Sequence, residues 1–221
     1  MNATQKTIPN GWTHKKLGQI ASLYDGDWIL SKDLETGNDV RLLQLGDIGD
    51  GKFLNKTSKY ISDSRCAELG CTLLKNGDIL IARLGDPVGK SCLLDSVEGK
   101  TITSVDVAIT RPKEEVRPEY LLYLINSDPV RKSINSVASG STRKRISRSN
   151  LEKIELRIPT RLEQANIAEI LGAVDGEIQK TEMIIAATDK LKKGLMQQLF
   201  TQGIGHTKFK KTKIGNMPSE W

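Results

Sequence analysis

The sequence contains few cysteines and histidines, and this shortage excludes several classes of protein. The three cysteines among 221 residues offer no pairing framework, and their odd number is typical of a reducing compartment. Cys66 and Cys71 are not spaced like a zinc knuckle, and only His14 and His206 add imidazole groups. We therefore expect neither a disulfide scaffold nor a bound metal ion.

Aromatic residues and long apolar runs are also scarce. Aromatic residues make up 5 % of the chain, so a core must consist mostly of leucine, isoleucine and valine. No stretch approaches the roughly 20 apolar residues of a membrane span, and residues 1–12 lack the apolar run of a signal peptide. We therefore expect a cytoplasmic protein with no membrane partner.

The charge is moderately positive. Lysine and arginine number 33 against 27 acidic residues, which gives a formal net charge of +6. This excess favours a polyanionic partner only mildly, because many proteins with such a charge bind no nucleic acid. The charge alone leaves nucleic-acid binding open.

Residues 1–159 predict a mixed α/β domain. Four short runs rich in valine, isoleucine and leucine predict strands at Arg41–Leu45, Asp78–Arg83, Val88–Leu94 and Val105–Thr110. Two helices are expected at Arg117–Asn126 and Asp128–Ala138, the second with Asp128 as N-cap and Pro129 in the first helical position. A last strand, Ile154–Ile158, ends at Pro159.

A long helix is predicted over residues 160–200. Thr160 and Glu163 have the spacing of a capping box, and no proline follows until Pro218. Alternating steps of four and three residues mark a coiled-coil seam with three polar interruptions. The seam comprises Ile167, Leu171, Val174, Ile178, Thr181, Ile185, Thr188, Lys192, Leu195 and Leu199.

The length of this helix predicts a partner helix. About 40 helical residues span about 60 Å, whereas a domain of this size is roughly 40 Å across. The apolar stripe therefore needs a second helix, from this chain or from another. A kinked helix packed on its own domain is the alternative, and the three glycines Gly172, Gly176 and Gly194 leave a break near Gly176 open.

The end of the chain echoes its beginning. Ile8-Pro9-Asn10-Gly11-Trp12 and Asn216-Met217-Pro218-Ser219-Glu220-Trp221 each contain proline, two residues and tryptophan. The echo follows the long helix, so we interpret residues 201–221 as a linker, flexible and rich in glycine and lysine through Lys213, and the start of a second repeat.

A basic segment follows the second predicted helix and is the candidate DNA contact. The segment 139–148 is rich in small residues and contains no acid. Its cations neutralise phosphates, and arginine also reads guanine with two hydrogen bonds. A solvated loop without a ligand is the alternative. The candidate DNA-binding residues here are Ser141, Thr142, Arg143, Lys144, Arg145 and Arg148.

The segment Gly85–Ser91 resembles a phosphate-binding loop, but its spacing differs. Three residues separate Gly85 from Gly89, where the motif needs four, and the residues after Lys90 predict a strand instead of a helix. We interpret the segment as a β-hairpin turn in which Lys90 points at a DNA phosphate. No other cofactor motif, histidine-based triad or metal-ligand cluster is present, so we expect no catalysis and no cofactor.

Several short motifs follow one another along the whole chain. They are Ile8-Pro9-Asn10-Gly11-Trp12 with Leu17-Gly18; Asn76–Gly85 running into Val88-Gly89-Lys90; Gly140-Ser141-Thr142; Ile158-Pro159 with Glu163-Gln164 and Ile167-Ala168; and Lys192-Lys193-Gly194-Leu195-Met196. In this order they resemble the specificity subunits of type I restriction-modification systems. Two departures are Thr160, where the family often has a second proline, and a second repeat that stops at Trp221.

The resemblance implies a fold, a function and partners. The family's subunits carry two target-recognition domains, each followed by a long helix, and the antiparallel helices dock methyltransferase and restriction (translocase) subunits. We therefore expect an α+β chain with a target-recognition domain over 1–159 and a spacer helix over 160–200. It would read half of a bipartite double-stranded DNA target without catalysis of its own.

Because only one long helix is present, we expect a homodimer through Ile167, Leu171, Val174, Ile178, Ile185, Leu195 and Leu199, reading an interrupted palindrome. Two alternatives remain at this point. One is a coiled-coil scaffold that does not bind DNA, and the other is a nucleotide-binding enzyme that uses the loop from Gly85 to Lys90.

Overall fold

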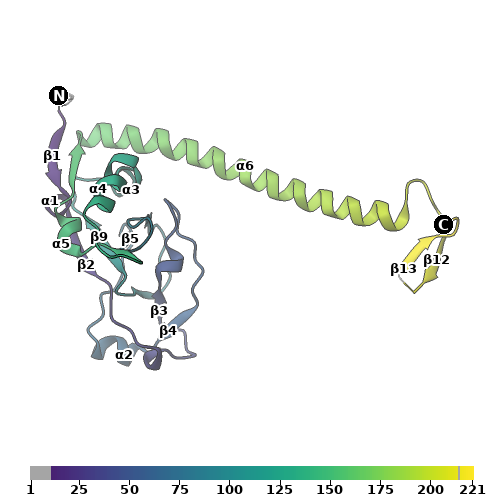
Figure 1. Cartoon of the computed structure of the whole chain (residues 1–221), viewed down its shortest axis with the longest axis horizontal. Helices are drawn as coiled ribbons and strands as arrows, with labels where there is room; N and C mark the ends of the chain where they lie inside the picture. Colours follow the sequence, from purple (N-terminus) through teal and green to yellow (C-terminus); the bar gives the residue numbers. More distant parts are fainter. Residues whose placement is uncertain (1–10, 214) are drawn as a thin grey trace. The chain divides into compact units, whose positions relative to one another are not determined.

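The structure is a computed structural model that describes residues 11–213 and 215–221. The described chain divides into two compact units between Glu169 and Ile170, inside the long helix. The division falls after the first helical turns because Ile167 and Ala168 pack against the core of the first unit. The first unit mixes helices and strands and is followed by a long helix, which confirms the predicted α+β class (Figure 1).

The central sheet of the first unit is antiparallel, with strand order β2-β9-β5-β7. Three of its strands confirm predicted runs: β5 and β7 are shorter than predicted, and β9 is shifted by two residues. The strands are β2 (Ala21–Asp25), β5 (Ile79–Ala82), β7 (Ser91–Leu93) and β9 (Val107–Pro112). All four residues of β5 are buried, since Ile79 and Ile81 face one hydrophobic cluster and Leu80 and Ala82 face another. Both faces of the sheet are therefore covered.

Helices cover one face of this sheet (Figure 1). They are α1 (Leu17–Ile20), α3 (Pro118–Asn126), α4 (Asp128–Ser136) and α5 (Arg148–Glu152). The positions of α3 and α4 confirm the two predicted helices. The predicted cap is wrong by one residue: Ser127 is the N-cap of α4, Asp128 begins the helix, and Pro129 follows in the first turn, where its missing N–H costs no hydrogen bond.

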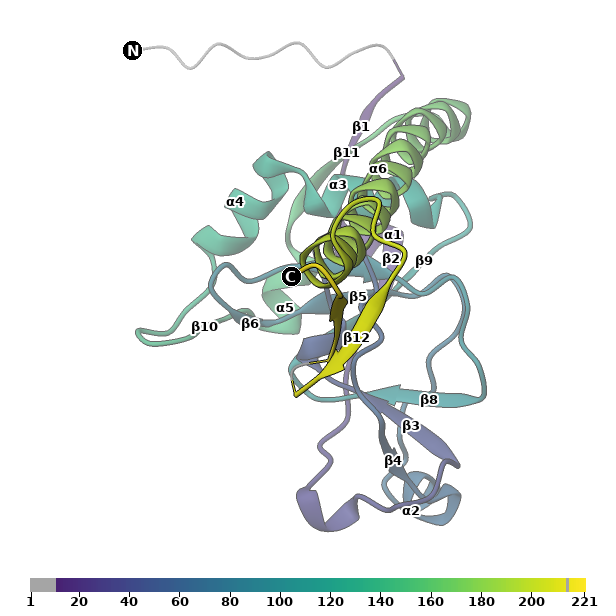
Figure 2. The same cartoon turned by 90° about the vertical axis from the view of Figure 1, so that its right-hand side faces the viewer.

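A second, smaller sheet lies beyond the central one in the first unit (Figure 2). Its order is β4-β3-β8, from Lys59–Ile61, Val40–Leu43 and Lys100–Thr103, and α2 (Asp63–Glu68) packs on it. The strands β3 and β8 are parallel, and β3 and β4 are antiparallel. The predicted run Arg41–Leu45 therefore belongs to this sheet. Two short 3₁₀ helices, Ser31–Asp33 and Leu45–Asp47, border it.

The strand β11 (Glu155–Ile158) confirms the predicted run before Pro159 and pairs with β1 (Thr13–Lys16). The helix α6 begins after it and runs without interruption from Arg161 to Gln202. Its three glycines do not break it, so the break that was left open near Gly176 is absent from α6.

The first turn of α6 is capped by hydrogen bonds. Thr160 Oγ1 accepts from the Glu163 amide at 3.4 Å, as the capping box predicts. The Glu163 carboxylate, which the capping box would direct to the Thr160 amide, accepts from the Trp12 indole at 3.1 Å. The buried Gln164 side chain accepts from the Arg117 amide at 2.9 Å and donates to the Pro159 carbonyl at 3.1 Å.

The segment after α6 corrects the predicted linker. The strands β12 (Phe209–Thr212) and β13 (Gly215–Pro218) form an antiparallel hairpin, so a flexible linker through Lys213 is wrong for β12. Part of the echoed motif, residues 8–10, lies outside the described residues. None of the helices in the described ranges is long and apolar enough to span a membrane.

Asp47 holds the loop between β3 and β4. Its side chain is fully buried and accepts from the amides of Gln44, Lys56 and Thr57 at 2.7–2.8 Å, and from the Thr57 hydroxyl. Burial alone would raise the pKa of this carboxyl, but the hydrogen bonds outweigh burial and lower it.

We expect Asp47→Ala to lower the free energy of unfolding by roughly 2–4 kcal/mol, since each unsatisfied buried donor costs about 1–3 kcal/mol. Because the folded pKa of Asp47 is lowered, its contribution is present above the unfolded pKa of about 3.9 and is lost as the pH falls below that value. Urea unfolding at pH 7 and pH 3 measures this, with Asp95→Ala on the surface as control. A pH-independent difference would contradict the assignment.

Candidate nucleic-acid interface

The basic segment is a closed loop attached to the glycine-rich turn. The strand β10 (Lys144–Arg145) pairs with β6 (Leu84–Gly85). At its base, Ser139 and Arg145 exchange two backbone hydrogen bonds, of 3.0 and 2.7 Å. The glycine-rich turn and the basic segment, which are distant in the sequence, thus lie side by side. Sequence reasoning had treated them separately.

Two glycines are required for these loops. Gly140 has φ +122°, and a Cβ there would lie 2.3 Å from the Arg143 carbonyl oxygen. Gly89 has φ +87°, and a Cβ there would lie 2.8 Å from Ile134 Cγ2. Both positions demand a conformation and a close approach that only glycine allows. Gly140 is required by its own loop, whereas Gly89 is required by the close approach of α4.

The predicted cations divide into two groups. Lys90 and Arg143 are exposed and Lys144 is half-buried, and within the described part of the chain none of the three forms an ion pair. Arg145 pairs with Asp106, with 2.8 Å between Nη1 and Oδ1. Arg148 lies 3.4 Å from Asp25 and 3.5 Å from Glu152.

The prediction of one loop over 139–148 needs correction. Lys144 and Arg145 form a strand, because their backbone groups pair with β6. Arg148 is the first residue of α5, where Ser147 accepts a capping bond from the Asn150 amide at 3.2 Å. The predicted contacts Ser141 and Thr142 are exposed at the tip of the loop.

A buried arginine connects this loop to the sheet. Arg83, at the end of β5, is 7 % exposed, and its Nη1 pairs with Asp25. Its Nε donates to the Ile146 carbonyl at 3.0 Å, and its own carbonyl accepts from the Ile146 amide at 2.9 Å. Sequence reasoning missed this role, although an arginine that ends a buried apolar run was a signal for it.

An open cleft of about 460 Å³ lies next to the loop, and sequence reasoning also missed it. Its walls include Asp27, Trp28, Gln44 and Asp106. Trp28 is 68 % exposed, which is unusual for so large an apolar side chain. Partial burial raises the pKa of Asp27, and the Thr72 amide, which donates to both carboxylate oxygens at 3.2 Å, opposes that rise.

The structure favours the hairpin interpretation of the glycine-rich turn. Lys90 is followed directly by β7, which pairs with β5, so the turn does not lead into a helix whose N-terminus could bind phosphate. Among residues 11–213 and 215–221, no group of three or more histidine, cysteine, aspartate or glutamate side chains is placed to hold a metal ion.

The seam of α6 is anchored at one end and exposed beyond it. Ile167 packs against the core of the first unit. The later seam residues are 38–57 % exposed: Leu171, Val174, Ile178, Ile185, Leu195 and Leu199. An apolar stripe of this length is typical of a surface that binds another helix.

Comparisons with known proteins agree on one family. The model of the type I restriction modification DNA specificity domain matches residues 9–187. A relative, the type I restriction enzyme MjaVIII specificity subunit of Methanocaldococcus jannaschii, is 27 % identical over 220 residues, covering 97 % of this chain and 48 % of the relative. The chain thus spans about half the length of the curated relatives it matches.

Two solved structures show the same fold. A chain from a study of complex assembly and conformational transition in a type I restriction-modification system has a TM-score of 0.66 at 20 % identity. The HsdS subunit from Thermoanaerobacter tengcongensis has a TM-score of 0.62 at 18 % identity. Each likeness covers 90 % of this chain and 47 % of the other.

We expect Gly140→Ala to open the basic loop, because the new Cβ would meet the Arg143 carbonyl and the positive φ would be strained by about 1–3 kcal/mol. Amide hydrogen exchange at Ser139 and Arg145 should accelerate. Gly37→Ala is the matched control, since nothing lies within 4 Å of its Cβ position. Unchanged protection in Gly140→Ala would show that the loop is not held as described.

Proposed function

Because the chain belongs to the family of type I restriction-modification DNA specificity domains, we propose that it reads one half of a bipartite DNA target for partner enzymes. Methyl transfer and DNA cleavage would be performed by separate methyltransferase and restriction (translocase) subunits, and this chain would supply recognition without a catalytic step. The chain would act in the cytoplasm, where its DNA target lies.

The observation that carries this proposal is the ordered basic loop. Arg143 and Lys144 are held on a closed backbone loop that the buried Arg83 ties to the sheet. Neither cation has a carboxylate partner among the described residues, so their charge is free for phosphate. Lys90, in the turn that follows β6, adds a third free cation.

The exposed seam of α6 supports a second part of the proposal, a two-fold homodimer. A second copy paired along this seam would supply a second recognition domain and a second long helix. Isologous pairing of identical stripes is the commonest closed arrangement. Such a dimer would read an interrupted palindrome with a spacer of fixed length and would present α6 to the partner subunits.

We expect Arg143→Ala/Lys144→Ala to weaken DNA binding and to flatten its dependence on salt. Each lost phosphate contact lowers the slope of log K against log salt by about 0.9, so the slope should fall by up to about 1.8. Binding of a duplex DNA at several salt concentrations measures this.

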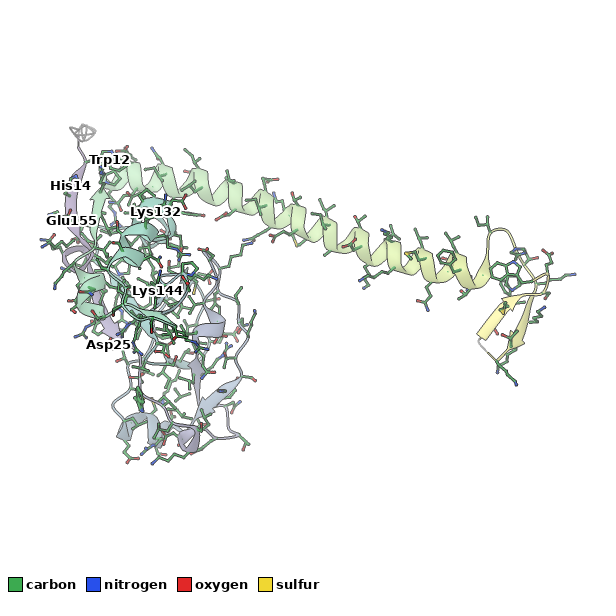
Figure 3. All side chains as sticks on the ribbon, viewed as in Figure 1. Trp12, His14, Asp25, Lys132, Lys144 and Glu155 are labelled. Atoms are coloured by element: carbon green, nitrogen blue, oxygen red, sulfur yellow. The ribbon has the colours of Figure 1, made fainter. Side chains whose placement is uncertain are left out.

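The matched control is Lys15→Ala/Lys16→Ala, which removes the same charge from β1. In Figure 3, Trp12 and His14 mark this strand, and Lys144 lies apart from them. If both variants lose the same slope, the change in DNA binding reflects net charge and not a contact made by the loop. If the unaltered chain shows no salt-dependent binding at all, the scaffold interpretation is favoured.

We expect Leu171→Asp/Ile178→Asp to be monomeric, because buried unpaired charges in the seam are strongly unfavourable. Sedimentation at micromolar concentration should show a dimer for the unaltered chain and a monomer for the variant. The control is Ala173→Asp/Ala187→Asp, which adds the same charges at exposed positions of the helix outside the seam. A monomeric unaltered chain, with or without DNA, would refute the dimer.

A further inference from the structure

The cleft beside Trp28 is continuous with the basic loop. Arg145, in the loop, pairs with Asp106, which lines the cleft. Arg148, after the loop, lies 3.4 Å from Asp25, two residues before the cleft residue Asp27. A polyanion held by the free cations of the loop would therefore pass beside the cleft.

The polar groups of the cleft are mainly hydrogen-bond acceptors. Asp27 and Asp106 contribute carboxylates, and Gln44 contributes an amide group. Asp106 Oδ1 is buried and lies 2.8 Å from Arg145 Nη1, yet no well-directed hydrogen bond reaches it. The Asp106 side chain as a whole is 28 % exposed, so the exposed part of its carboxylate can accept from a ligand donor.

Two carboxylates at one site repel phosphate, so the cleft is unsuited to the DNA backbone. They suit the exocyclic amines of DNA, adenine N6 and cytosine N4, which donate hydrogen bonds in the major groove. The exposed face of Trp28 offers an apolar contact of the kind that a thymine methyl group or a base plane accepts.

The backbone holds the two walls of the cleft in place. The Gly26 amide donates to the Val107 carbonyl at 3.0 Å, and the Asp27 amide donates to the Thr103 carbonyl at 2.7 Å. A Cβ at Gly26 would lie 2.1 Å from the Ser104 carbonyl oxygen, so only glycine permits this approach. Asp47 fixes the wall that carries Gln44. The recognition groups are therefore preorganised.

We infer that this cleft is the base-reading site of the domain, in which Asp106, Asp27 and Gln44 accept hydrogen bonds from an adenine or cytosine amine and Trp28 contacts the neighbouring base. The inference rests on the proposed function, because it needs the chain to bind DNA. The loop would then supply affinity for DNA, and the cleft would supply sequence discrimination.

The test begins with a pool of duplexes that contain a randomised core. The full-length chain selects from the pool, the bound duplexes are sequenced, and affinity is measured for the enriched duplex and for a scrambled one. We expect Trp28→Ala and Asp106→Asn each to lower the ratio of the two affinities by about fivefold to 100-fold, the range for one base contact. In Trp28→Ala, which removes no charge, the slope of log K against log salt should stay unchanged.

Matched controls separate this effect from general damage. Asp50→Asn removes a carboxylate that pairs with an arginine, Arg131, at 3.0 Å, but does not line the cleft. Leu73→Ala removes an exposed apolar side chain outside it. Both should leave the affinity ratio intact. Because Trp28 is largely exposed, its variant keeps the test valid if Asp106→Asn fails to fold.

Modified DNA tests whether the cleft contacts a base amine directly. Replacing one adenine of the enriched duplex by purine removes its amine, and replacing one cytosine by 2-pyrimidinone does the same. At the base read by the cleft, this deletion should weaken binding of the unaltered chain but not of Asp106→Asn, as a double-mutant cycle requires for a direct contact.

The outcomes distinguish the two proposals. If Trp28→Ala and a folded Asp106→Asn keep the full affinity ratio while Arg143→Ala/Lys144→Ala loses slope, the cleft assignment is overturned and DNA binding stands. If the unaltered chain enriches no sequence and shows no salt-dependent binding, the proposed function is overturned and the cleft assignment with it.

Discussion

The guanidinium of Arg83 sits at the end of a strand that is otherwise apolar, and a charge buried there without a partner would cost several kcal/mol. Asp25, the last residue of β2, and the Ile146 carbonyl satisfy it. These two partners come from segments distant in the chain. Because one side chain needs both, β2, β5 and the residues after the basic loop are held in one arrangement.

Asp25 extends the same constraint. It serves both Arg83 and Arg148, so its carboxylate joins the buried charge to the first turn of α5. The ion pair between Arg145 and Asp106 similarly joins β10 to the residues before β9. Among the described residues, the cations of this region that form no ion pair are Arg143 and Lys144 in the loop and Lys90 in the adjacent turn. Pairing near the core thus determines which charges remain available outside.

The sequence allowed the local features to be predicted, because each depends on neighbouring residues. The period of seven in α6, Pro118 at the start of α3 and the mis-spaced glycines before Lys90 are examples. The pairing of β6 with β10 and the cleft between Trp28 and Asp106 depend on contacts between distant segments. Composition and periodicity carry no information about such contacts. The site predicted from the sequence therefore lacked the cleft and the pairing of the two loops.

The division between free cations and clustered acceptors has a physical reason. Phosphates are identical along DNA, so cations that bind them add affinity and set the register without distinguishing sequences. Base edges differ in their donors and acceptors, and a rigid acceptor discriminates because the wrong base leaves it unsatisfied. Arg145 lies between the two regions, since its pairing with Asp106 orients an acceptor while its own strand carries the free Lys144. Phosphate binding at the loop would therefore place the base edges beside the acceptors that discriminate among them.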